Sequence, residues 1–232
     1  MRGSRSNATF VAVCAVFIAI KLLFELYAGD FPGKDQALAF SWPLVLGGIG
    51  FGVAGLLAER SLGLPDWQGR RAAVWAIASG VVYGCITVAS DVFRPGEASP
   101  IAKGSGSIHL ALPWSIPFYT FGAIFLEFFL RLGLLCGLVW IIHVALLRRR
   151  AFRPVFWTVN AAVALYEVLP WMTRDAQRGQ WGQAALALGG PLYLSNVFEG
   201  WLLLRFGWLT PILFRLAFYA VWHVLYGGVF AA

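Results

Sequence analysis

The stretch PWSIPFYTFGAIFLEFFLRLGLLCGLVWIIHVALL, residues 113–147, decides the fold class of this chain. Apart from tyrosine and cysteine, its ionisable side chains are Glu127, Arg131 and His143. A straight α-helix of this length would reach roughly 50 Å, whereas the hydrocarbon core of a bilayer is about 30 Å thick. The stretch therefore predicts a membrane helix that is either tilted and protruding or broken near Gly133 or Gly137.

The composition of the whole chain agrees with a membrane protein. Of its 232 residues, 59% are hydrophobic and 12% are charged, whereas soluble domains carry about 25% charged residues. Continuous apolar runs recur, which excludes a disordered chain, a disulfide scaffold, an ordinary soluble enzyme and a β-barrel. The runs cover about 9–27, 39–58, 72–90, 113–147, 155–171, 184–204 and 209–230. We expect an all-α, polytopic transmembrane helical bundle of about seven spans, with eight as the alternative if the fourth run is two spans.

The chain shows no internal repeat and no separate soluble part, so residues 1–232 are predicted to form a single membrane domain. The first run is predicted to be a retained span rather than a signal peptide, because it lacks a small-residue cleavage site. It also contains Lys21 and Glu25, one helical turn apart, which are expected to pair with each other. The glycines of the second run predict close helix approach.

The net charge of +7 is interpreted as a signal of membrane orientation and not of nucleic-acid binding. In the seven-span arrangement, ten basic residues lie on one side of the membrane and five on the other, which predicts a cytoplasmic N-terminus. The larger set is Arg2, Arg5, Arg60, Arg70, Arg71, Arg148, Arg149, Arg150, Arg153 and Arg205. The smaller set is Lys34, Arg94, Lys103, Arg174 and Arg178.

Four of the runs carry stripes of polar residues at helical spacing. Charges inside spans are costly in lipid, so these stripes are expected to face one another and to mark either a functional site or structural pairing. The stripes are Glu127 and Arg131 with Tyr119, Asn160 and Glu167, Asn196 and Glu199, and Arg215, Tyr219 and His223.

Depth along each run predicts two polar groups. One is a Glu199–Arg215 pair toward the cytoplasmic side, and the other contains Glu127, Glu167 and His223. Two interpretations stay open: either the charges are paired and hold the helices together, or Glu127 and His223 flank a hydrated cavity and activate water. No cofactor is predicted, and a metal is only weakly supported, because no zinc-type cysteine spacing or H-E-x-x-H pattern occurs.

The segment Glu127-Phe-Phe-Leu-Arg131 resembles the E-x-x-x-R core of the CPBP family, which comprises type II CAAX prenyl proteases and bacteriocin-processing or bacteriocin-immunity proteins. The resemblance extends over about half of the chain and places a CPBP-like core at residues 113–231. It implies an intramembrane endopeptidase that hydrolyses membrane-proximal peptide bonds. In that case Glu127 would activate water, Arg131 would orient Glu127, and Glu167 and His223 would complete the catalytic set.

The chain departs from the family pattern at several positions. The first glutamate of the family's Glu-Glu pair falls on Leu126, and the histidine of the family's middle motif has no counterpart here, with Asn160 at that spacing. The histidine of the last motif aligns with Arg215 and its asparagine with Tyr219. These departures motivate a second hypothesis, a catalytically inactive pseudoprotease that binds or protects against a membrane-embedded peptide or protein partner. A third hypothesis is a small transporter, suggested by intramembrane carboxylates and the Gly189-Gly190-Pro191 break.

Overall fold

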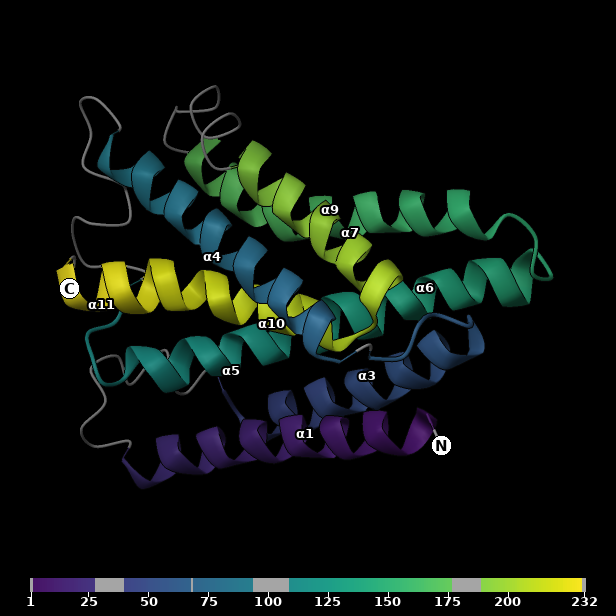
Figure 1. The fold of residues 1–232 in the computed structure, drawn as a ribbon, viewed down its shortest axis with the longest axis horizontal. Helices are drawn as coiled ribbons and strands as arrows, with labels where there is room; N and C mark the ends of the chain where they lie inside the picture. Colours follow the sequence, from purple (N-terminus) through teal and green to yellow (C-terminus); the bar gives the residue numbers. More distant parts are fainter. Residues whose placement is uncertain (1, 28–39, 68, 94–108, 177–188, 231–232) are drawn as a thin grey trace.

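The fold is that of a helical membrane protein, and no strand occurs in the part of the chain that the structure describes. The structure is a computed structural model, and it describes residues 2–27, 40–67, 69–93, 109–176 and 189–230. Most of the helices run roughly along the longest axis of the molecule, whereas α4 (Arg70–Val92) and α9 (Gly190–Phe206) cross them obliquely (Figure 1). Five of them are long and apolar enough to cross a membrane: Ser6–Leu26, Trp42–Ser61, Arg70–Ser90, Ser115–Leu146 and Leu209–Gly227.

The helices follow the predicted apolar runs closely. The first three are α1 (Arg2–Leu26), α3 (Trp42–Ser61) and α4 (Arg70–Val92). The last two before the C-terminal helix are α7 (Phe152–Ala176) and α9 (Gly190–Phe206). The C-terminal helix consists of α10 (Leu209–Tyr219), the wide-turn π-helical segment η4 (Ala220–Gly227) and α11 (Gly228–Phe230).

The fourth run forms one unbroken helix over Ser115–Leu146. It consists of α5 (Ser115–Glu127), the π-helical segment η1 (Phe128–Cys136), a short α6 (Gly137–Val139) and the π-helical segment η2 (Trp140–Leu146). The predicted alternative of a break near Gly133 or Gly137 therefore does not occur. Glu127 is the last residue of α5, and Arg131 lies in η1, where the wider turn changes the angular spacing of side chains. Such π-helical insertions often occur at functional sites.

Glycines allow three pairs of helices to approach closely. A Cβ atom at Gly55 of α3 would overlap the backbone of Leu132 in η1, and one at Gly80 of α4 would overlap the carbonyl of Phe214 in α10. A Cβ atom at Gly200 of α9 would overlap the side chain of Asn160 in α7. Small residues provide this kind of contact between helices in lipid, where apolar burial alone gives little driving force.

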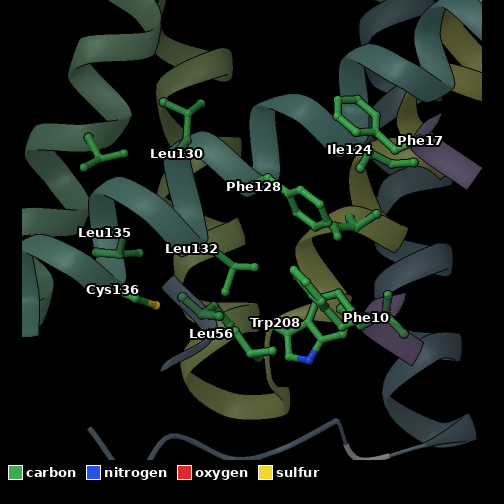
Figure 2. Packing of buried hydrophobic residues seen from close by; sticks show 14 of the residues in the cluster. Phe10, Phe17, Leu56, Ile124, Phe128, Leu130, Leu132, Leu135, Cys136 and Trp208 are labelled. Carbon is green, nitrogen blue, oxygen red and sulfur yellow. The ribbon is translucent and has the colours of Figure 1, made fainter. Parts of the chain in front are cut away.

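The centre of the bundle is aromatic and aliphatic. The Phe10 ring of α1 lies 5.2 Å from the ring of Phe128 and 5.5 Å from that of Trp208, centroid to centroid. Figure 2 shows these rings beside Leu56 and Leu132, which come from α3 and η1. The first two helices are thus joined to the central helix and to the α9–α10 turn by one continuous apolar cluster.

Polar contacts fix the bundle at the end where the N-terminus lies. The Trp208 indole N–H donates to Ser6 Oγ (3.0 Å), and the Trp208 backbone N–H donates to Glu59 Oε1 (3.2 Å). Arg60 donates to the Asn7 side chain, and Trp140 Nε1 donates to Ser61 Oγ at 3.0 Å. These contacts place the start of α1 beside the end of α3 and the α9–α10 turn, and they place the end of α3 beside η2.

The end of α3 and the connection from η2 to α7 carry arginines of the larger basic set. Both lie toward the N-terminus of the chain in Figure 1. Of the smaller basic set, Lys34, Arg94, Lys103 and Arg178 lie outside the described residues. The cytoplasmic location of the N-terminus stays a prediction. The expected pair in the first span is confirmed, because Lys21 Nζ lies 3.0 Å from Glu25 Oε1.

Candidate functional site

Four helices bring charged side chains together in the interior of the bundle. Arg215 of α10 lies at the centre of this group, which we call the ionic cluster. Its members are Glu127, Arg131, Glu167, Asn196, Glu199 and Arg215. The ionised side chains are at most 10% exposed, so the cluster is shielded from the surroundings of the bundle.

The guanidinium group of Arg215 contacts three carboxylates at once. Its Nε donates to Glu127 Oε1 at 2.6 Å, its Nη1 to Glu167 Oε1 at 2.6 Å and its Nη2 to Glu199 Oε2 at 2.7 Å. The second oxygen of Glu167 accepts from Nη2 at 3.2 Å, so that pair is bidentate. Charge-assisted hydrogen bonds of this length are the strong ones in proteins.

Arg131 approaches the same centre from η1. Its Nη2 donates to Glu199 Oε2 at 2.5 Å and to the Asn196 side-chain oxygen. The Asn196 oxygen also accepts from Arg215 Nη2 at 3.1 Å, and its amide donates to the Leu192 carbonyl at 2.9 Å. Glu199 and Asn196 therefore join the two guanidinium groups. Arg131 Nε and Nη1 are buried and make no hydrogen bond.

The expected Glu199–Arg215 pair is present, and Glu127 and Glu167 join it. His223, however, does not lie with these carboxylates. It occupies a neighbouring group in which its Nδ1 lies 3.2 Å from His109 Nδ1 and its ring stacks on Tyr119 with centroids 4.1 Å apart. The physical reason is distance along the helix. His223 follows Arg215 by two helical turns and lies in η4, so its side chain does not reach the carboxylates that Arg215 contacts.

Tyr219 lies between the two groups. Its hydroxyl accepts from Arg215 Nη1 at 3.5 Å, while its ring contacts those of Tyr119 and His223 at 5.9 Å and 4.9 Å between centroids. Asn160 lies outside both groups. Its amide donates to the Val197 carbonyl at 3.0 Å, so it joins α7 to α9 instead of facing the charges.

Sequence reasoning missed two buried ionisable residues. His109 lies just before the central helix, and nothing in a helical pattern marks it as a partner of His223. Its burial lowers the pKa of the imidazole from 6.5 to about 4. Glu59, buried at the end of α3, follows directly after the second apolar run, and no prediction was made for it. The available signal was the position of this carboxylate directly after an apolar run, because the helix continues past the end of the run.

The members of the ionic cluster form ion pairs and hydrogen bonds with one another. Among the residues that the structure describes, no group of three or more histidine, cysteine, aspartate or glutamate side chains is placed to hold a metal ion. His143 lies apart from both groups, with its Nδ1 2.9 Å from the Arg150 carbonyl oxygen.

Comparisons with known proteins add no relative to this description. No protein-family model, curated protein or solved structure matches the chain.

Proposed function

We propose that this protein is a non-catalytic helical membrane protein, organised like a CPBP protease, that acts by binding a membrane-embedded peptide or protein. The observation that carries the proposal is the position of Arg215, which donates to Glu127, Glu167 and Glu199 at 2.6–2.7 Å. By the resemblance, this position corresponds to the histidine of the family's last motif. A guanidinium group keeps its protons at any working pH and has no acceptor, so it is unable to take part in proton transfer.

The state of Glu127 also argues against water activation. A general base needs a free lone pair within hydrogen-bond reach of a water molecule. Glu127 Oε1 accepts from Arg215, and Glu127 Oε2, which has no hydrogen-bond partner, belongs to a side chain that is 1% exposed and so is shielded from bulk water. The neighbouring position, Leu126, supplies no second carboxylate where the family pattern has one.

The second candidate is the endopeptidase itself, and one observation favours it. Glu127 Oε2 makes no hydrogen bond, and Arg131 Nε lies 3.9 Å away. A substrate that displaced Arg215 would leave this oxygen available as a base, with Arg131 oriented toward it.

Hydrolysis in proteoliposomes distinguishes the two functions. The substrates are fluorogenic peptides anchored by a lipidated or transmembrane C-terminal segment. The non-catalytic function predicts equal background signal from the wild type and from Glu127→Gln. Cleavage by the wild type that Glu127→Gln abolishes, in a variant that still elutes as folded protein, would establish the endopeptidase instead.

Binding is tested separately at the outer surface of α4. This helix exposes Trp75 and Val82, which do not contribute to the ionic cluster. A photoreactive amino acid at either position should crosslink to a membrane protein in cells, and the crosslink should survive Glu127→Gln. Crosslinks to lipid alone from these and from equivalent positions on α1 would contradict a protein partner.

A further inference from the structure

The end of the bundle at which the N-terminus lies carries exposed arginines from two neighbouring elements, and we call this group the arginine end. Its members come from the last turn of α3, the connection between η2 and α7, and the start of α7: Arg60, Arg148, Arg149, Arg150 and Arg153. The elements are in contact, because Arg149 Nη1 donates to the Ser61 carbonyl at 3.4 Å. Figure 1 shows the connection between η2 and α7 at the opposite end of the long axis from the C-terminus.

The positive charge of the arginine end is not balanced by carboxylates. In the part of the chain that the structure describes, none of its five arginines lies within 4.0 Å of an aspartate or glutamate oxygen. Glu59 precedes Arg60 but is buried inside the bundle. Arg60 and Arg149 donate to neutral oxygens, those of Asn7 and Ser61. The guanidinium groups are therefore available to an anion from outside the chain.

The apolar residues beside these arginines place them at the level of lipid headgroups. The helix Ser115–Leu146 has 32 residues and so is about 48 Å long, whereas a bilayer with its headgroups is about 40–45 Å thick. Its last turns expose Ile141 and Leu146, by 46% and 68%, which favours contact with acyl chains. Trp140 and Trp157 are also exposed, and tryptophan is enriched where acyl chains meet headgroups.

The connection between η2 and α7 holds its arginines in a backbone conformation that such residues rarely adopt. The φ angles of Arg148, Arg149 and Ala151 are 50°, 65° and 60°, in the left-handed region that favours glycine. The Arg149 backbone N–H donates to the His143 carbonyl at 2.7 Å, and His143 Nδ1 lies 2.9 Å from the Arg150 carbonyl oxygen. Arginine at positions where glycine would be less strained points to a role for its side chain.

We propose that the arginine end binds the headgroup of an anionic phospholipid. Exposed guanidinium groups match phosphate oxygens in charge and in hydrogen-bond geometry. Basic clusters directly beside membrane spans recognise anionic headgroups in the same way. This interaction is separate from the proposed function, because it involves neither the ionic cluster nor the outer surface of α4.

The test compares two lipids by native mass spectrometry of the full-length protein in detergent. The lipids are phosphatidylglycerol, which is anionic, and phosphatidylcholine with the same acyl chains, and the wild type should bind phosphatidylglycerol more tightly. The triple variant Arg148→Gln/Arg149→Gln/Arg150→Gln should bind phosphatidylglycerol at least about tenfold more weakly, because each arginine near an anionic surface contributes about fivefold. Its binding of phosphatidylcholine should be unchanged. Arg205→Gln is the matched control, since Arg205 is exposed at the end of α9, and it should keep the preference.

Glycine variants separate the charge of this connection from its backbone shape. Arg149→Gly removes one guanidinium group and also relieves the positive φ angle, so it should weaken phosphatidylglycerol binding without lowering the thermal midpoint in phosphatidylcholine vesicles. Ala151→Gly makes the same kind of backbone change without a change of charge, so it should bind phosphatidylglycerol as the wild type does. This pair keeps the test available if the triple variant does not fold.

Three results would overturn the inference. The first is equal binding of the two lipids by the wild type, as expected if the arginine end binds an acidic protein segment and not a lipid. The second is a preference for phosphatidylglycerol that persists in the triple variant. The third is a preference that falls as far in Ala151→Gly as in Arg149→Gly, since that would assign it to the shape of the connection.

Discussion

Arg215 and Glu199 form a buried ion pair, with Nη2 2.7 Å from Oε2, and the same carboxylate oxygen accepts from Arg131 at 2.5 Å. The pair joins α9 to α10, two helices connected by the short turn at Gly207 and Trp208. Through Arg131 the contact reaches the central helix, and through Glu167 it reaches α7. Four helices therefore depend on one set of charges.

Removal of Arg215 should destabilise the bundle strongly. Arg215→Met leaves the carboxylates of Glu127, Glu167 and Glu199 without their main cation, and loss of one partner from a buried ion pair costs about 3–5 kcal/mol. Denaturation followed by tryptophan fluorescence or by size-exclusion chromatography measures the change. Arg205→Met is the control, because Arg205 is exposed at the end of α9. Equal stabilities of the two variants would contradict the assigned role of Arg215.

Stability should fall on acidification through the range set by His109. Burial lowers the pKa of this imidazole from 6.5 to about 4, so between these values the unfolded chain binds a proton that the folded chain does not. The free energy of unfolding therefore decreases as the pH falls, by at most about 1.4 kcal/mol per pH unit. His109→Asn should flatten this part of the profile. An unchanged slope in the variant would show that other groups determine it.

The contact between α3 and η1 should depend on Gly55. A Cβ atom there would overlap the backbone of Leu132, which side-chain rotation is unable to relieve. Gly55→Ala should therefore cost about 1–3 kcal/mol as overpacking. Gly47→Ala is the matched control on the same helix, because no atom lies within 4 Å of a Cβ at that position. If Gly55→Ala left the free energy of unfolding unchanged, α3 and η1 would have to lie farther apart than this contact requires.

The sequence predicted the helices well because membrane spans are long and continuous. The run 209–230 coincides with the C-terminal helix, and Ser115–Leu146 fills nearly all of the run 113–147. The α7 and α9 helices were harder to delimit. Both carry polar residues that interrupt hydropathy, and α9 has 17 residues.

The polar stripes were sufficient to predict that α5, α7, α9 and α10 share charged residues, because unpaired charges are expensive in lipid. They were not sufficient to place His223. Helical spacing put His223 on the same face as Arg215, but the π-helical turns of η4 and the position of His109 decide which group it joins. A partner that lies in a loop, such as His109, leaves no periodic signal.

The most direct test of the central claim is a double-mutant cycle between Arg215 and Glu199. Free energies of unfolding are measured for the wild type, Arg215→Gln, Glu199→Gln and the double variant. The ionic cluster predicts a coupling energy of about 2 kcal/mol or more, with the double variant more stable than the sum of the single changes implies. Additivity within about 0.5 kcal/mol would contradict the account, because it would show that the two side chains do not interact in the folded bundle.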